Sequence, residues 1–173
     1  MTQLSGQNLI AGAFTAGADA VFRAVDPTRN QPIAPDFHPA TTADVERAMS
    51  AAADAFQTFR TTSGATRATF LESIATEIEA LGETLIERGQ AETGLPAARL
   101  QGERGRTCGQ LRLFAALVRD GSWVDARIDT ALPDREPLPR PDIRRMLRPL
   151  GPVVVFGSSN FPLAFSTAGG DTA

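Results

Sequence analysis

The segment that most constrains the fold is Val153–Phe156, an apolar run between a Gly-Pro pair and a Gly-Ser-Ser-Asn turn. A short apolar run bounded by turn residues is typical of a strand buried in a parallel sheet. A parallel strand needs neighbours, and a strand, a turn and a helix normally lead back to a second parallel strand. Here only the beginning of a helix follows, over 162–173. We therefore expect an α/β protein of which this chain is the front, truncated part.

Upstream of that run, three stretches show the apolar spacing of amphipathic helices. The first begins at the N-cap candidates Thr41 and Thr42 and breaks at Thr61–Gly64. The second carries Phe70, Ile74, Ile78, Leu81 and Leu85 on one face, is expected to be kinked or divided at Gly82, and ends at Gly94; the third runs from about Pro96 to Arg119 and stops at Gly121. The phenylalanines of this layer, Phe56, Phe59 and Phe70, are interpreted as core residues.

The remaining segments read as short strands and connectors. Ala20–Val25 and Gln31–Phe37 are expected to form a hairpin over the helical layer. Trp123–Ile128 is expected to be a short strand, and Ile143–Arg148 an edge strand. Between them, Asp134–Asp142 is rich in proline, which predicts an exposed connector with polyproline-like conformation.

Composition excludes several classes of function. A net charge of −3 argues against a nucleic-acid binder that depends on general electrostatics. With one cysteine and one histidine, the chain cannot form Cys₄ or Cys₂His₂ zinc sites, so no metal site is expected. All seventeen basic residues are arginine, which excludes Schiff-base and P-loop lysines. No apolar run approaches the roughly 18 residues of a membrane span, and Met1–Ile10 does not read as a signal peptide, so a cytoplasmic location is expected.

Some residues invite a catalytic interpretation that their context does not favour. Cys108 lies within the third helix, where a free cysteine is commonly a small buried hydrophobe. His38 lies between prolines, without an evident partner that would make it a general base. Ser158 and Ser159 do not make the G-x-S-x-G elbow of serine hydrolases, because in Gly157–Phe161 a phenylalanine stands where the final glycine is needed.

Two motifs, in context, carry a resemblance to a known family. Residues 149–151 read Pro-Leu-Gly, the apolar run follows, and Asn160–Pro162 read Asn-Phe-Pro, while Glu92–Pro96 read Glu-Thr-Gly-Leu-Pro. In order and spacing, over nearly the whole chain, these elements resemble the N-terminal portion of the aldehyde dehydrogenase superfamily. The sequence of residues 157–173 most resembles the branch that acts on 2,5-dioxovalerate (α-ketoglutarate semialdehyde).

The resemblance implies oxidation of an aldehyde to a carboxylic acid with NAD or NADP, the branch favouring NADP. A cysteine thiolate attacks the carbonyl, and a glutamate-activated water releases the acyl group. Asn160 matches the family's asparagine, whose amide holds the negative charge on the thiohemiacetal oxygen. Phe156, Gly157, Ser158 and Ser159 match the loop whose backbone passes the cofactor. Most members have Pro-Trp where this chain has the two serines, so side-chain contacts there do not transfer.

The resemblance also implies substrate contacts by Phe161 and by Arg106, whose guanidinium would pair with the far carboxylate of a semialdehyde. A solvated surface arginine remains the alternative for Arg106. The family's nucleophile, general base and cofactor lysine are expected downstream, so this chain alone is expected to be inactive. The expected parts are 1–122, the beginning of the cofactor-binding domain, 123–148, the strands that mediate homo-oligomerisation, and 149–173, the first Rossmann strand and active-site turn. The competing interpretation is a non-catalytic helical interaction domain.

Overall fold

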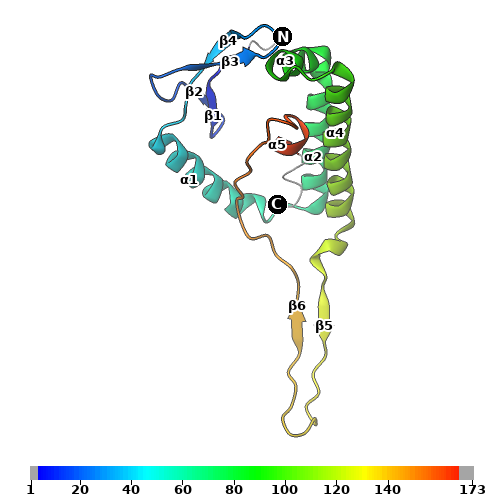
Figure 1. Cartoon of the computed structure of the whole chain (residues 1–173). Coiled ribbons are helices and arrows are strands. Elements are labelled where there is room, and N and C mark those ends of the chain that lie inside the picture. The colour runs from blue at the N-terminus through cyan, green and yellow to red at the C-terminus, as the bar shows by residue number, and fades with distance from the viewer. Residues whose placement is uncertain (1–3, 168–173) are drawn as a thin grey trace.

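The computed structural model describes residues 4–167, which form helices and short antiparallel strand pairs (Figure 1). In chain order the elements are β1 (Asn8–Ile10), β2 (Ala13–Thr15), β3 (Phe22–Asp26), β4 (Gln31–Phe37), α1 (Thr42–Phe59), α2 (Gly64–Ala80), α3 (Gly82–Thr93), α4 (Ala97–Asp120), the 3₁₀ turn η1 (Ser122–Val124), β5 (Arg127–Asp129), β6 (Ile143–Arg145) and α5 (Ala164–Thr167). The strands pair as β1–β2, β3–β4 and β5–β6. Helices and small strands are thus combined as predicted, but none of the described strands is parallel to another.

The packed centre of the molecule is the antiparallel pair of α2 and α4 (Figure 1). Ala68 and Ala75 on α2 and Ala115 on α4 are completely buried. The two backbones approach so closely that a Cβ atom at Gly64 would lie 2.3 Å from the carbonyl oxygen of Val118. Small side chains therefore make this interface, and a larger residue at these positions would separate the helices.

Two bidentate ion pairs join the exposed edges of the same helices. Arg119 donates to both carboxylate oxygens of Glu72 at 2.8 Å, and Arg112 donates to both oxygens of Glu79 at 2.7 Å. These hydrogen bonds hold the pKa of each glutamate below its ordinary value. The side chains are nearly half exposed, so water screens the pairs.

The predicted helix boundaries are confirmed. Thr41 caps α1 in a reciprocal capping box with Asp44, and the hydrogen bonds from Thr41 together with the nearby Arg47 lower the pKa of the Asp44 carboxyl. Gly94 and Gly121 end α3 and α4 in the left-handed conformation, with φ of 69° and 83°.

Gly82 divides the second predicted helix into α2 and α3. Its φ of 56° is left-handed, which glycine adopts without steric cost. At this joint the carbonyl of Gly82 accepts a hydrogen bond of 2.8 Å from Arg104 of α4. A side chain of α4, the helix that lies against both α2 and α3, therefore contacts the joint between them.

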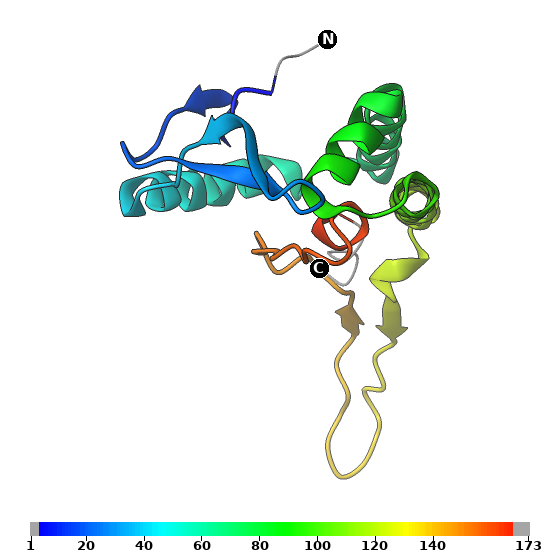
Figure 2. The ribbon, with the colours of Figure 1, turned by 45° about the horizontal axis from the view of Figure 1, so that its top comes forward.

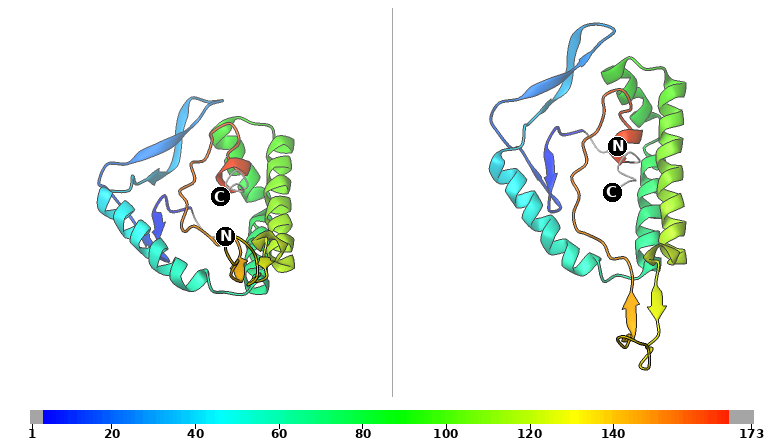
Figure 3. Two further views of the ribbon diagram at one scale, coloured as in Figure 1. Left: turned by 90° about the horizontal axis from the view of Figure 1, so that it is seen from below. Right: turned by 60° about the horizontal axis from the view of Figure 1, so that its bottom comes forward.

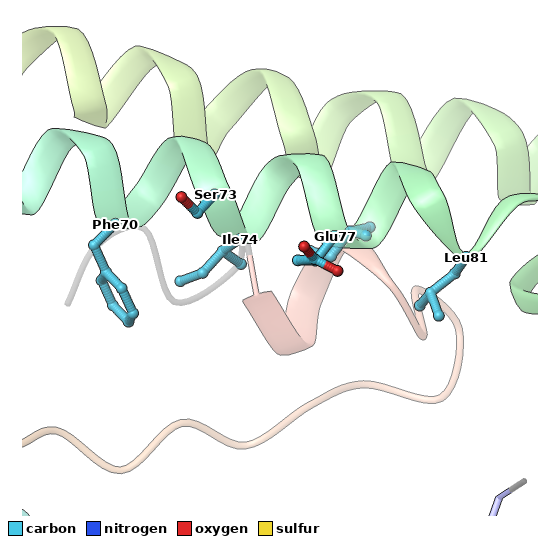
Figure 4. A pocket seen from close by; sticks show the side chains of 6 residues that line it. Phe70, Ser73, Ile74, Glu77 and Leu81 are labelled. Atoms are coloured by element: carbon cyan, nitrogen blue, oxygen red, sulfur yellow. The ribbon is translucent and has the colours of Figure 1, made fainter. Parts of the chain in front are cut away.

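The predicted apolar faces of α1 and α2 are not buried as expected. Phe59 and Phe70, which make an edge-to-face pair, are 45% and 52% exposed, so the prediction that they belong to the core is wrong. On α2 the completely buried side chains are the alanines Ala68 and Ala75, and Phe70, Ile74 and Leu81 point away from α4 (Figure 4). The larger apolar side chains thus line an open hollow of about 430 Å³.

The N-terminal strands form the expected hairpin. β3 and β4 pair in antiparallel register with an irregularity between Phe22 and Ala24, and Phe22 stacks on Phe37 at 5.6 Å. The hairpin lies against α3, where Arg88 donates a hydrogen bond to the carbonyl of Ala34 (Figure 2). The expectation that the hairpin covers the helical layer is confirmed for α3.

The segment after α4 projects as a long two-stranded arm (Figures 1 and 3). The prediction of a strand over Trp123–Ile128 is wrong in its first half: Ser122–Val124 make a 3₁₀ turn, and Asp125 has φ of 43°, so extended pairing begins only at Arg127. The edge strand predicted over Ile143–Arg148 is present but shorter, since β6 ends at Arg145. Residues 134–142 are an exposed connector as expected, but it turns back through a bridge between Leu132 and Arg140 rather than extending as polyproline.

The strand predicted over Val153–Phe156 is also absent. These residues form no strand, and Val153, Val154 and Phe156 are 56%, 61% and 89% exposed. A strand requires backbone hydrogen bonds to a neighbour, and among residues 4–167 no neighbour pairs with this segment. The helix expected after it begins at Ala164; its expected remainder, 168–173, lies outside the described residues.

Candidate functional site

The turn that contains Asn160 lies directly after the exposed apolar segment. The amide of Phe161 donates to the carbonyl of Ser158 at 3.2 Å, which closes the turn. The hydroxyl of Ser158 donates to Oδ1 of Asn160, so the side-chain oxygen is held by its own turn. In the described part of the chain Nδ2 of Asn160 has no acceptor, and the residue is exposed. The amide N–H₂ is therefore free to donate to a ligand.

α4 holds this turn from the side. Arg99 donates to the backbone carbonyl of Asn160 at 3.1 Å, and its guanidinium lies 4.3 Å from the ring centre of Phe161. Phe161 in turn stacks on Phe165 of α5, with ring centres 4.6 Å apart. One arginine thus contacts both the backbone and the aromatic ring of the turn.

Glu103, one helical turn after Arg99, was missed by sequence reasoning, as was Arg99 itself. It is only 4% exposed, and its carboxylate accepts hydrogen bonds from the amides of Leu163 and Ala164 at 3.2 and 3.4 Å. In the sequence an Arg and a Glu four apart on a helix read as an ordinary surface pair. No signal along the chain indicates that a segment sixty residues later covers the carboxylate.

An open hollow of about 690 Å³ lies beside the turn. Ser159, Asn160 and Phe161 line it together with residues of α3, α4 and their connection, and with Pro27 after β3. The hollow brings Asn160 and Phe161 to one surface, which is wide enough for a small aldehyde. Its remaining lining residues are Glu92, Thr93, Leu95 and Arg99.

Arg106, the predicted substrate-binding arginine, lies on the other side of the aromatic pair. Its guanidinium is 5.6 Å from the ring centre of Phe165, and the residue is exposed. Among residues 4–167 it forms no ion pair. The structure therefore links Arg106 to Phe161 through Phe165, and it leaves this cation available to an anion.

The predicted cofactor residues are placed differently. Phe156 and Gly157 lie on the exposed extended stretch, Ser158 closes the turn, and only Ser159 lines the hollow. Phe156 is 89% exposed, so nothing within residues 4–167 encloses it. The described residues do not by themselves enclose a nicotinamide dinucleotide.

Cys108 and His38, the two other residues considered for catalysis, both lie in surroundings that favour a structural role. Cys108 is buried between α4 and α2, where its thiol lies 3.5 Å from the carbonyl of Ala75, and burial raises its pKa. A buried, protonated thiol is a poor nucleophile, in agreement with its interpretation as a packing residue. Nδ1 of His38 lies 3.5 Å from the carbonyl of Ala18, which fits a hydrogen-bonding role. Within the described residues no group of acidic, histidine and cysteine side chains could hold a metal ion, and no helix could cross a membrane.

Solved structures resemble this arrangement of helices and strands. HpcC from Thermus thermophilus matches 95% of this chain and 30% of its own, with a TM-score of 0.77 and 23% identity. Betaine aldehyde dehydrogenase from Staphylococcus aureus, solved in complex with NAD⁺, matches 76% of this chain and 26% of its own, with a TM-score of 0.68 and 23% identity. The fold is thus a part of the aldehyde dehydrogenase fold, as predicted for its N-terminal portion.

Sequence comparison gives the same family. The model of the aldehyde dehydrogenase family matches residues 14–169, and the chain belongs to that family. Alpha-ketoglutaric semialdehyde dehydrogenase 2 of Azospirillum brasilense is 62% identical, and alpha-ketoglutaric semialdehyde dehydrogenase of Acinetobacter baylyi is 51% identical, each over 99% of this chain and 33% of the relative. The chain spans about a third of the length of these curated relatives.

Proposed function

We propose that this chain is part of an enzyme that oxidises α-ketoglutarate semialdehyde to the dicarboxylic acid, with NAD or NADP as hydride acceptor. The names of its relatives at 62% and 51% identity support the substrate. Since the chain spans a third of those relatives, the activity is proposed for the complete protein. For the chain alone we keep the expectation of inactivity, because Cys108 is buried and cannot replace the nucleophile of the family.

The free amide of Asn160 is the observation that carries this proposal. Its Oδ1 accepts from Ser158, and among residues 4–167 Nδ2 of this exposed residue has no acceptor. A negative charge develops on the aldehyde oxygen when a nucleophile adds to the carbonyl carbon. An amide fixed in advance stabilises that charge without reorganising at the moment of reaction.

The surroundings of the turn support a role in substrate binding for Phe161 and Arg106. Phe161 lines the hollow beside Asn160. Arg106 forms no ion pair among residues 4–167 and could form a bidentate pair with the carboxylate of a semialdehyde. If so, Arg106→Ala raises KM for the acidic semialdehyde and leaves KM for a neutral aldehyde of similar length unchanged.

The cofactor and the assembly belong to the complete protein. NAD is the cofactor in the structure of the Staphylococcus aureus relative, which supports NAD, whereas NADP remains a prediction from the branch resemblance. We infer that Phe156–Ser159 contribute one side of the cofactor site. We also infer that 123–148 mediate homo-oligomerisation, that 1–122 and 149–173 belong to the cofactor-binding domain, and that the enzyme is cytoplasmic.

The test is Asn160→Ala in the complete protein that carries this sequence, with reduction of the nicotinamide followed by absorbance. We expect kcat to fall by about 10²–10³-fold, the usual effect of removing one such donor, with a small change in KM. Asn30→Gly, in the β3–β4 turn where φ is already 52°, is the matched control and should leave kcat unchanged. Normal turnover by Asn160→Ala would refute the proposed role of this amide.

A further inference from the structure

Glu103 is a carboxylate in the interior of a long helix that solvent barely reaches. At 4% exposure it is the most buried acidic residue among those described. A buried carboxylate is costly unless hydrogen bonds replace its hydration. The partners of Glu103 therefore show what the molecule gains by keeping it there.

The two carboxylate oxygens of Glu103 accept hydrogen bonds from different parts of the chain. Oε2 accepts the amide protons of Leu163 and Ala164, and Oε1 accepts a hydrogen bond of 3.2 Å from Nε of Arg99. The two amides belong to the segment that immediately follows the Asn-Phe-Pro turn. Glu103 thus fixes the downstream end of that turn to α4.

Arg99 fixes the upstream end. While its Nε donates to Glu103, its NH2 group donates to the carbonyl of Asn160 at 3.1 Å, and its plane lies over the ring of Phe161. The carboxylate orients the guanidinium, and the guanidinium holds the backbone of Asn160. Both sides of Pro162, which itself restricts the chain, are then attached to one turn of α4.

We propose that Glu103 is a positioning residue for Asn160, acting through Arg99 and through the amides of Leu163 and Ala164. The inference rests on the proposed role of Asn160 in holding the carbonyl oxygen. Glu103 does not touch the reacting atoms; it fixes where Nδ2 lies before the aldehyde arrives. Such pre-organisation matters because a displacement of about 1 Å in a catalytic group can cost about 10²-fold in rate.

The other carboxylates paired with arginines of α4 provide a contrast. Glu72 and Glu79 join α2 to α4, are nearly half exposed and make no contact with the turn. A general stabilising role of an ion pair on α4 would make Glu72→Gln and Glu103→Gln equivalent. A positioning role makes only Glu103 affect turnover.

The experiment compares Glu103→Ala, Glu103→Gln and the control Glu72→Gln in the complete protein. We expect Glu103→Ala to lower kcat by about 10²-fold, with a much smaller change in KM. Glu103→Gln keeps an oxygen for the two amides but loses the charge opposite Arg99, so its loss should be partial. Glu72→Gln should retain the kcat of the parent protein.

The double variant Glu103→Gln/Asn160→Ala separates positioning from general stability. If Glu103 acts through Asn160, the double variant is no slower than Asn160→Ala alone. Full multiplication of the two losses would overturn the inference, as would an unchanged kcat in both Glu103 variants. If Asn160→Ala itself has no effect, the proposed function fails instead.

A readout without turnover covers variants that fold poorly or lack activity. Backbone amide exchange at Leu163 and Ala164 should be faster in Glu103→Gln than in the parent, and unchanged in Glu72→Gln. Equal exchange at both amides in the parent and in Glu103→Gln would show that the carboxylate does not hold this segment, and the inference would be wrong.

Discussion

The α2–α4 pair and the segment 150–156 are both rich in apolar residues, yet only the first is packed. Ala75 is completely buried between the helices, whereas Leu150 and Phe156 are 101% and 89% exposed. A helix satisfies its backbone hydrogen bonds internally and needs a neighbour only for its side chains. An extended segment needs a neighbour for both. The comparison shows that an apolar pattern in the local sequence is sufficient to specify a helix. It specifies a strand only when a neighbouring strand is present to pair with it.

The largest difference should appear in backbone amide exchange. Amides in the middle of α2 and α4 are bonded within packed helices and should exchange only by opening of the pair. Those of 153–157 have no partner among the described residues and should exchange at nearly the rate of an unfolded peptide. Mass spectrometry of peptides from both regions measures this. Slow exchange over 153–157 would show that the segment is covered in solution.

Two identical substitutions test the packing itself. Leu100 of α4 is completely buried, with its side chain against Gly89, and Leu150 is fully exposed. We expect Leu100→Ala to lower the free energy of unfolding by about 2–5 kcal/mol because it leaves a cavity. Leu150→Ala should change it by no more than about 0.5 kcal/mol. Denaturant unfolding of the two variants, with equal m-values, would give this contrast; equal losses would contradict it.

A smaller difference between the α2–α4 interface and segment 150–156 is expected in the rate of thiol alkylation. Cys108 is buried at the α2–α4 interface and its pKa is raised, so little thiolate is present at neutral pH. Iodoacetamide should alkylate it more than about tenfold more slowly than the exposed thiol of a Cys108→Ser/Leu150→Cys variant, which follows from the dependence on thiolate and access. The difference should disappear in denaturant. Rapid alkylation of the native parent chain would indicate that the helix pair opens readily.

The smallest effect concerns the ion pair of Glu72 with Arg119. The hydrogen bonds from Arg119 lower the pKa of Glu72 below its ordinary value of 4.5. A lowered folded-state pKa means that the pair stabilises the fold above pH 4.5 and loses this contribution as the pH falls through the folded-state value. Glu72→Gln should therefore be slightly less stable than the parent at pH 7, with a difference that shrinks in acid. A difference that grows on acidification would reverse this assignment.

The same contrast explains which features the sequence predicted. The helix ends at Gly94 and Gly121 depend on residues beside them in the chain and were predicted correctly. The division at Gly82 was one of two predicted alternatives, and Thr41 was one of two N-cap candidates. Which face of each helix is buried was harder to predict. The apolar spacing indicates the large residues of α2 as core, whereas α4 lies so close to α2 that the alanines are buried instead.

The candidate site follows the same rule. Asn160 and Phe161 were found through a motif contained within a few residues, and the structure brings them to one hollow. Arg99 and Glu103 were not found, because their importance depends on a segment about sixty residues downstream that no local pattern connects to α4. The strand over Val153–Phe156 was predicted from its own residues, without a partner to pair with.

The division of the second helix at Gly82 has a consequence for the other end of the molecule. Arg104 of α4 holds the carbonyl at this joint, so the direction in which α3 leaves the joint follows α4. Farther along α3, Arg88 binds the β4 carbonyl of Ala34. Arg104 and Arg88 thus connect α4 to α3 and α3 to the β3–β4 hairpin. The orientation of this hairpin therefore depends on α4, a helix that is distant from it in the sequence.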